Sequence, residues 1–351
     1  MTWEAFFRQG FIPFEDAVER QADVLAEAAP RIADRVSAAV RDVPRPTRPA
    51  FLGIGASVAA LGAPVAFLRA RGIPASLLNA AEFEEQALEG SDVLVALSQS
   101  GRSRETVAAV RATTAPTLAI VNVSGSPLTE VADTVVGLGD LPDSLASTIG
   151  FVASAMAAGM LAEAWTTGIA EEDWASLGAR TDEFVRGSAA TIDRLVDVAA
   201  QAALVEVTGP YRQGGALDAA ALLLREVSRL PSAAYETRAY LHGLMEATRP
   251  STLHLVLDGP DSSYIVPALA ELGRTVVTIG GDRIDGASLH VGIPTRSDLE
   301  VPAFTAALMQ RLALGVARRV DVDPDEFRFL GTNTKLEDAD PSGAAAAEVP
   351  S

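Results

Sequence analysis

The stretch DVLVALSQSG, which runs from Asp92 to Gly101, decides the fold. Its first part is a continuous apolar run, which is typical of a strand buried on both faces of a parallel sheet. The run enters Ser98-Gln99-Ser100-Gly101, a loop of small and polar residues. Because ligands of open parallel sheets bind beyond the carboxyl ends of the strands, we expect this loop to lie at a binding site.

Similar apolar runs recur along the chain and alternate with helical patterns. The first half holds them at 51–55, 117–123 and 134–138, and the second half at 204–209, 253–257, 275–279 and 289–293. Matching positions are 154 to 161 residues apart, as Phe51 is from Val205 and Val95 from Val256. The sequence therefore predicts an α/β fold in which one domain has been duplicated.

Five regions are expected along the chain. An N-terminal helical segment over residues 1–48 holds an amphipathic helix at 15–42, and a phosphate-binding domain follows at 49–166. A helical linker at 167–200 leads to a second domain at 201–320. The remaining residues, 321–351, form a C-terminal tail that carries Lys335.

Composition argues against several classes of function. A formal net charge of −18 repels both nucleic-acid phosphates and anionic lipid, so neither nucleic acid nor a membrane is an expected partner. There is no cysteine, and the three histidines lack a metal-ligand spacing, so we expect no metal site. We expect no organic cofactor either. The N-terminus lacks the pattern of a signal peptide, and the most apolar helical run, Phe151–Leu161, is too short for a membrane span. A cytoplasmic location is expected.

The loop after Leu97 is predicted to bind phosphate. Its small residues can point their backbone N–H groups at one spot, and a helix that begins near Ser103 adds its positive N-terminal end. The alternative is an ordinary turn in which Ser103 caps the helix. The other glycine-rich loop, Gly53-Ile54-Gly55, lacks the third glycine of a dinucleotide fingerprint, so the phosphate is expected on a small metabolite.

Lys335 is the only lysine, whereas the chain has 27 arginines. Generic positive charge in this protein therefore does not require lysine. Lysine differs from arginine because its amine can lose a proton and attack a carbonyl. Lys335 is accordingly a candidate functional residue, and the alternative is a chance survivor on a solvated tail.

Four segments together resemble the tandem SIS (sugar isomerase) domain family, which includes the isomerase half of glucosamine-6-phosphate synthase and stand-alone amino-sugar-phosphate deaminases. They resemble the family's Gly-Thr-Ser loop, its Ser-Gln-Ser-Gly hallmark, its Val-Ala-Ser-Thr turn and its Leu-Lys-Glu-Ile-Ser…Ala-Tyr…Lys-His-Gly series. The segments are Gly55-Ala56-Ser57, Leu97–Gly101, Leu145–Thr148, and Leu224–Ser228 with Ala234-Tyr235 and Leu241-His242-Gly243. The resemblance implies two tandem SIS domains, each a flavodoxin-like three-layer sandwich with a parallel sheet between helices.

The resemblance also implies roles for single residues. Glu226 would be the base that moves a proton between C1 and C2, and Lys335 would bind the carbonyl carbon of the open-chain sugar. His242 would assist ring opening from a neighbouring subunit, which implies a homodimer with its site at the subunit interface. The residues implied to hold the phosphate or the sugar are Gly55, Ala56, Ser57, Ser98, Gln99, Ser100, Ser103, Ala146 and Ser147.

The expected function is a phosphosugar aldose–ketose isomerase or aminosugar-6-phosphate deaminase, acting on a hexose or amino-hexose 6-phosphate. A fructosamine-6-phosphate deglycase is an alternative, and a sugar-phosphate sensor without turnover is a rival of another class. Without the family pattern, Glu226 fits an exposed acid at a helix end, and His242 fits a structural histidine in a loop. Ala56, Ile149 and the pair Arg238-Ala239 depart from the family's residues, which leaves the identity of the sugar open.

Overall fold

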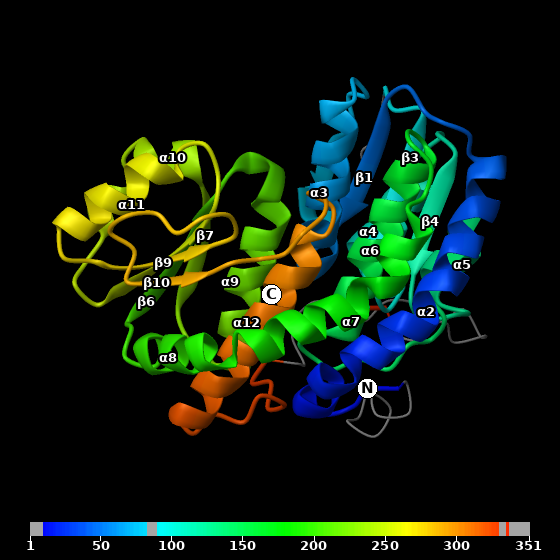
Figure 1. The fold of residues 1–351 in the computed structure, drawn as a ribbon. Coiled ribbons are helices and arrows are strands. Elements are labelled where there is room, and N and C mark those ends of the chain that lie inside the picture. The colour runs from blue at the N-terminus through cyan, green and yellow to red at the C-terminus, as the bar shows by residue number, and fades with distance from the viewer. Residues whose placement is uncertain (1–9, 83–89, 330–334, 337–351) are drawn as a thin grey trace, which may run out of the picture.

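The computed structural model describes residues 10–82, 90–329 and 335–336. It contains two α/β units, each built on a five-stranded sheet in which all the neighbouring strands are parallel. The two units stand side by side, with helices packed between them (Figure 1). The expected α/β fold class, with two parallel sheets flanked by helices, is therefore confirmed.

The two sheets have the same topology. The first has the order β2-β1-β3-β4-β5, and the second, read from its other edge, has the equivalent order β7-β6-β8-β9-β10. The strands of the first sheet are β1 (Pro49–Gly53), β2 (Ser76–Asn79), β3 (Val93–Ser98), β4 (Thr117–Val121) and β5 (Thr134–Gly137). Those of the second are β6 (Leu204–Gly209), β7 (Ser232–Glu236), β8 (Thr252–Leu257), β9 (Thr275–Ile279) and β10 (Leu289–Val291). This repeated order agrees with the duplication that the strand offsets predict.

One strand in each sheet, β2 and β7, has no counterpart among the predicted strands. Both are edge strands that pair with a single neighbour, β2 with β1 and β7 with β6. Neither is a fully buried apolar run, because β2 has only two apolar residues and β7 reads SAAYE. Pairing with the adjacent strand, which hydropathy does not report, places these residues in the sheets.

Helices cover both faces of the first sheet. Alternate strand residues such as Phe51 and Val95 lie in one buried apolar cluster with residues of α2 (Phe14–Asp42), α3 (Ala56–Ala70) and α6 (Ile149–Ala164). The intervening residues pack in a separate cluster against α4 (Arg104–Ala112) and α5 (Pro127–Val131). Because successive strand side chains point to opposite faces, each fully buried strand serves both layers. The helix predicted at 15–42 corresponds to α2, and the apolar helical run Phe151–Leu161 lies within α6.

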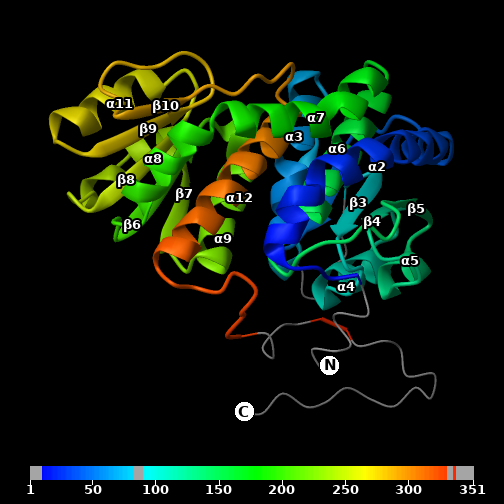
Figure 2. The same cartoon turned by 60° about the horizontal axis from the view of Figure 1, so that its bottom comes forward.

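The second sheet has the same three-layer arrangement. One face packs on α8 (Ala189–Ala199), α9 (Gly214–Val227) and α12 (Val301–Arg319), and the other on α10 (Thr237–Leu241) and α11 (Ser262–Glu271). Short 3-10 turns lie at Ala80–Glu82, Tyr211–Gln213 and Leu244–Ala247. The stretch expected to be a helical linker holds α7 (Glu171–Gly187) and α8, and α7 contacts both α2 and α12 (Figure 2).

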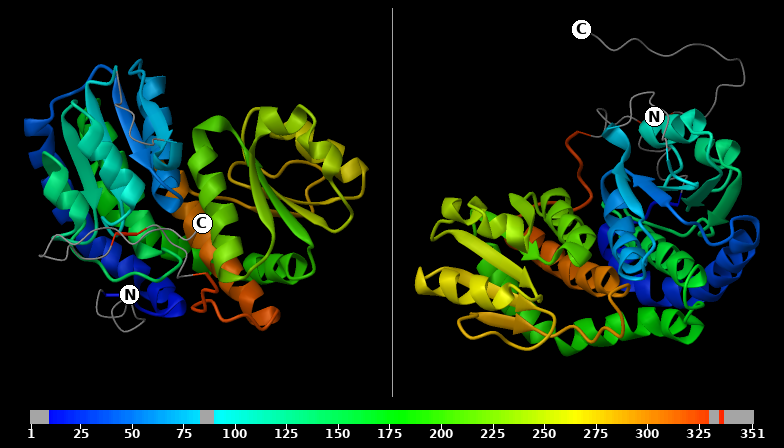
Figure 3. Two further views of the ribbon diagram at one scale, coloured as in Figure 1. Left: turned by 180° about the vertical axis from the view of Figure 1, so that it is seen from behind. Right: turned by 90° about the horizontal axis from the view of Figure 1, so that it is seen from above.

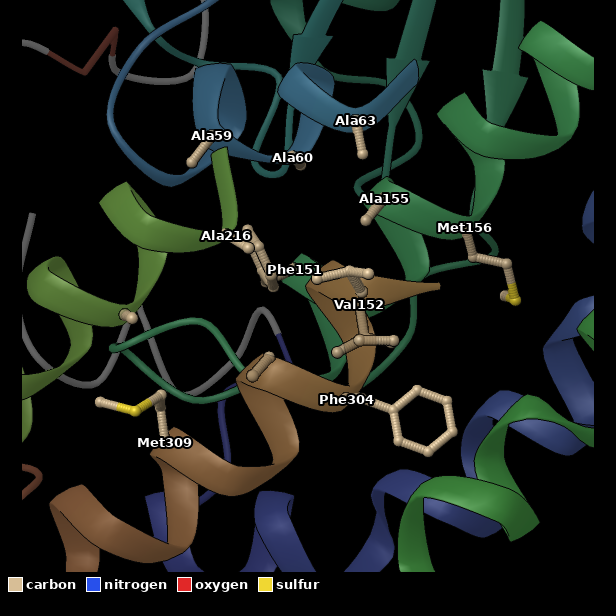
Figure 4. Packing of buried hydrophobic residues seen from close by; sticks show 14 of the residues in the cluster. Ala59, Ala60, Ala63, Phe151, Val152, Ala155, Met156, Ala216, Phe304 and Met309 are labelled. Carbon is tan, nitrogen blue, oxygen red and sulfur yellow. The ribbon is translucent and has the colours of Figure 1, made fainter. Parts of the chain in front are cut away.

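The two units share one apolar core. Helices α3 and α6 of the first unit meet α9 and α12 of the second, and alanines make up much of the contact, with Phe151 and Met309 among its larger residues (Figure 4). Phe304 of α12 points away from this contact and packs edge-on against Phe184 of α7. The same four helices lie between the sheets when the molecule is seen from behind and from above (Figure 3). This shared core fixes the position of one unit relative to the other.

Glycine allows α3 and α9 to touch at their backbones. A Cβ on Gly62 would lie 2.9 Å from the backbone nitrogen of Gly215, and a Cβ on Gly215 would collide with the carbonyl oxygen of Ala59. Neither backbone neighbour can rotate away as a side chain could. The close approach therefore requires glycine at both positions.

Gly215→Ala is expected to destabilise the protein by about 2–3 kcal/mol, because the added methyl group overpacks a backbone contact between the units. Gly214→Ala is a matched control, since a Cβ at Gly214 meets nothing within 4 Å. It should be neutral or slightly stabilising, because alanine is the better helix former. Urea unfolding of both variants measures the difference, and equal stability of the two would contradict the packing argument.

Candidate active site

A cavity of about 650 Å³ is lined by both units and by the C-terminal segment. The first unit contributes Gln99 from the loop after β3, and residues that precede α6. The second unit contributes the end of α9 and the turn after it. The polar lining residues are Gln99, Asp143, Ser144, Ser147, Arg225, Glu226, Arg229, Glu326, Arg328 and Lys335. Residues far apart in the sequence are thus brought to one partly open cavity.

The predicted phosphate loop follows β3 as expected. Ser98 and Ser100 are buried, and the hydroxyl oxygens of Ser98 and Ser103 lie 3.3 Å apart. Helix α4 begins at Arg104 with Ser103 at its N-cap position, but the Ser103 side chain makes no capping hydrogen bond. An ordinary serine cap therefore does not account for this residue, and its hydroxyl group lies beside a second hydroxyl at the helix N-terminus.

Gly101 fixes the turn of this loop. Its φ is +64°, in the left-handed region that favours glycine. A Cβ at this position would also collide with the side chain of Ser126. The loop can therefore take this compact shape only with glycine at this position.

Asp143 holds Ser147 at the cavity wall. One carboxylate oxygen accepts a hydrogen bond of 2.7 Å from the Ser147 hydroxyl, and the other accepts one of 2.8 Å from the backbone N–H of Thr148. Burial raises the pKa of Asp143, and these hydrogen bonds oppose the rise. The sequence prediction missed Asp143. Its spacing of four residues before Ser147, at the start of a helix, was the available signal.

The first glycine loop borders the same region. Gly55 is the N-cap of α3 with φ +58°, and Ser57 lies in the first turn of that helix. Ala56 lines a small hollow together with Ser147 and Glu226. Of the residues expected to bind substrate, Gln99 and Ser147 line the large cavity and Ala56 lines this hollow, whereas Gly55, Ser57, Ser98, Ser100, Ser103 and Ala146 line neither.

Glu226 lies in the last turn of α9 and faces the cavity. It is half-buried rather than an exposed acid at a helix end. Burial raises its pKa to about 7, and the positive charge of Lys335 opposes the rise. A carboxyl group with a pKa near neutrality can both accept and return a proton at physiological pH.

Lys335 lines the cavity and interacts electrostatically with Glu226. Part of the residue is exposed, yet the protein atoms around its amine remove enough water to lower its pKa. The charge of Arg102 lowers the pKa further, and Glu226 opposes both effects. The lone lysine therefore lies beside the candidate base, and a lowered pKa makes its amine a better nucleophile.

His242 does not join these groups within one chain. It is exposed at the C-terminal end of α10, on the face of the second sheet turned away from the first unit, and it does not line the cavity (Figure 1). His254, to which the sequence assigned no role, is fully buried on β8 beside Tyr240 and Glu206. Its Nε2 lies 2.8 Å from the Thr248 hydroxyl, which is consistent with a structural role.

Arginines gather at the end of the cavity formed by α9 and the C-terminal segment. Arg225, Arg229 and Arg328 line it there, and Glu326 is the acidic residue among them. Arg229 donates hydrogen bonds to the carboxylate and the backbone oxygen of Glu326, at 2.7 and 2.9 Å. Over the whole lining, four positive side chains face three negative ones, Asp143, Glu226 and Glu326, whereas the chain has a net charge of −18.

Within the described residues, no three histidine, aspartate or glutamate side chains gather closely enough to hold a metal ion. No described helix combines the length and the apolar character needed to cross a bilayer.

The comparisons with known proteins agree with this architecture. Residues 47–164, which make up most of the first unit, match the family model described as the SIS domain. No curated protein sequence matches the chain. Because the second unit has the same strand order as the first, the fold is that of two SIS-like domains in one chain.

Solved structures with the same fold cover nearly the whole chain. The C-terminal domain of glucosamine-fructose-6-phosphate aminotransferase from Francisella tularensis is 15% identical with a TM-score of 0.75, covering 90% of this chain and 98% of its own. Tagatose-6-phosphate ketose/aldose isomerase from Escherichia coli is 18% identical with a TM-score of 0.75, covering 89% and 94%. Glucosamine-6-phosphate deaminase from Thermotoga maritima is 18% identical with a TM-score of 0.67, covering 90% and 99%. At these identities the likeness concerns the fold.

Glu226→Gln is expected to change how stability depends on pH. The pKa of Glu226 is higher in the folded protein, about 7, than its ordinary value of 4.5, so folding favours the protonated form. Stability therefore falls as the pH rises from about 4.5 through 7. The variant does not lose this stability. From pH 5 to pH 8, its free energy of unfolding should therefore rise relative to that of the wild type by up to about 3 kcal/mol. Urea unfolding of both proteins at pH 5 and at pH 8 measures this change. If variant and wild type differ in stability by the same amount at both pH values, the raised pKa of Glu226 is contradicted.

Proposed function

We propose that the protein is a phosphosugar isomerase or aminosugar-phosphate deaminase that acts on a hexose or amino-hexose 6-phosphate. The observation that carries the proposal is the meeting of Glu226 and Lys335 in one cavity, beside the serine-rich loop that follows β3. A base with a pKa near 7, an amine with a lowered pKa and an anion-binding loop are the groups that a carbonyl–enediol interconversion needs.

In the isomerase reaction the loop of Ser98, Gln99, Ser100 and Ser103 binds the phosphate and thereby fixes the sugar chain. Lys335 binds the carbonyl end of the opened sugar. Glu226 removes the proton from C2 of the aldose to give an enediol, and then delivers a proton to C1 to give the ketose. Ser147, held by Asp143, lies at the cavity wall near the chain.

In the deaminase reaction the same proton transfer acts on an amino-aldose. Removal of the proton from C2 and protonation of C1 turn the C2 amine into an imine. Water then adds to C2 and ammonia leaves, so the product is a ketose 6-phosphate. The carbon skeleton is unchanged, and no oxidant or reductant takes part.

His242 assists ring opening in this proposal, and it does so from a second copy of the chain. Its exposed position outside the cavity supports this arrangement, because one chain alone does not bring it to Glu226. The active protein is then a homodimer whose site lies at the subunit interface. The proposal also includes a cytoplasmic location, in keeping with the phosphorylated substrates.

A second candidate is a fructosamine-6-phosphate deglycase, and the arginines favour it. The cavity volume of about 650 Å³ leaves room beyond a hexose phosphate, and the arginine-lined end attracts an anionic group. The reaction moves a proton from C1 to C2, which turns the C1–N bond into an imine. Water then adds to C1, and the amine leaves together with an aldose 6-phosphate.

Glucosamine 6-phosphate in deuterated water is expected to yield fructose 6-phosphate that carries deuterium at C1, as read by proton NMR. The initial rate should rise with pH through a midpoint of about 7, because only the ionised Glu226 can remove the proton. Glu226→Gln should reduce exchange by about 1,000-fold or more, within the range that general-base catalysis supplies. Phosphosugar binding without any exchange would support the sensor and contradict catalysis.

For the deglycase, an adduct of fructose with an amino acid, phosphorylated at C6, should release the free amino acid. Arg225→Gln and Arg328→Gln should raise KM about 10-fold for this adduct and leave KM for glucosamine 6-phosphate unchanged. Arg111→Gln, on α4, is the matched control because it changes an arginine that does not line the cavity. Equal effects on both substrates would contradict the arginine subsite.

A further inference from the structure

Several hydrogen bonds fasten the C-terminal segment to the body, and Val322 and Phe327 of the segment pack against the core. The carboxylate of Asp325 accepts a hydrogen bond of 2.9 Å from the backbone N–H of Phe14. Arg229 binds Glu326 through both its carboxylate and its backbone oxygen. Farther along, the backbone N–H of Leu336 donates a hydrogen bond of 2.8 Å to the carbonyl oxygen of Arg102. The last of these contacts joins the segment to the phosphate loop itself.

Lys335 and Leu336 pair with that loop as a short antiparallel bridge. Lys335 lies opposite Ser103. The segment of Lys335 and Leu336 is the short red stretch close to α4 in Figure 2. Successive side chains of an extended chain point to opposite sides. Lys335 accordingly lines the cavity, whereas Leu336 packs against the apolar cluster on the α4 and α5 face of the first sheet.

We propose that Leu336 is the positioning residue of Lys335: its side chain anchors the bridge on the first unit, and the bridge directs the amine toward Glu226. The anchor is apolar and half-buried, and its own N–H closes the bridge to Arg102. Replacing it with a small polar residue removes the apolar contact while leaving every group that touches the cavity unchanged.

The bridge also joins two parts of the site. Ser103 belongs to the predicted phosphate loop, and its partner in the bridge is the lysine. A phosphate held by this loop and the Lys335 amine are then coupled through one short piece of backbone. This part of the inference rests on the proposed function, because it requires the loop to bind phosphate.

The single lysine gives the proposal a direct measurement that needs no substrate. Acetic anhydride modifies only unprotonated amines, so the pH dependence of acetylation at residue 335, read by peptide mass spectrometry, reports the pKa of that amine. In the wild type this pKa should lie below its ordinary value of 10.5, because protein atoms and Arg102 surround the amine. In Leu336→Ser it should move back toward the ordinary value.

Two further variants separate positioning from general damage. Leu336→Met keeps an apolar side chain of similar volume and should restore the wild-type titration. Leu272→Ser makes the matched change at an exposed leucine beyond the end of α11 and should leave the titration unaltered. Circular dichroism should show that all the variants are folded. An unchanged Lys335 titration in folded Leu336→Ser would overturn the proposal.

Activity and phosphate binding are separate readouts. With glucosamine 6-phosphate, Leu336→Ser should lower kcat by about 10- to 100-fold and Leu336→Met should restore it, since a displaced catalytic group costs rate. Added inorganic phosphate should raise the Lys335 pKa in the wild type and have a smaller effect in Leu336→Ser. In one outcome, Leu336→Ser shifts the Lys335 pKa while added phosphate does not. That result would support the positioning role of Leu336 and count against phosphate binding by the loop, so failure of the inference and failure of the proposed function give different results.

Discussion

The burial of Glu226 next to a lysine amine is the interaction on which the account depends. A carboxylate loses hydration in a partly enclosed cavity, so its pKa rises to about 7, and the neighbouring positive charge limits the rise. The same surroundings lower the pKa of Lys335. Each group therefore lies nearer to neutrality than it would in water, where both would be fully charged at pH 7. Proton transfer next to a carbonyl group needs groups in this state.

The architecture brings this pair together from positions 109 residues apart in the chain. Glu226 is placed by α9, which α3 holds through the backbone contact of Gly62 with Gly215. Lys335 is placed by a bridge to the loop that follows β3 in the first unit. The cavity thus depends on a rigid contact between the two units and on a short attachment of the C-terminal segment. Neither unit provides the pair without the other.

Much of the fold could be predicted because its strands are buried on both faces. Continuous apolar runs identified eight strands, and their constant offset indicated the duplication. The edge strands β2 and β7 were not predicted, because pairing with a neighbouring strand, rather than apolar character, places them in the sheets. Within the site, Gln99, Ser147, Glu226 and Lys335 were predicted and line the cavity, whereas Asp143 and the arginines were missed. A buried carboxylate that acts through hydrogen bonds to a neighbouring serine has no distinctive motif in a single sequence.

The most direct test of the central claim is a crystal structure with glucitol 6-phosphate, an open-chain analogue of the sugar. The account predicts its phosphate on the loop from Ser98 to Ser103 and its C1–C2 end between Glu226 and Lys335. A phosphate seated among Arg225, Arg229 and Arg328, with C1 and C2 out of reach of Glu226, would contradict it.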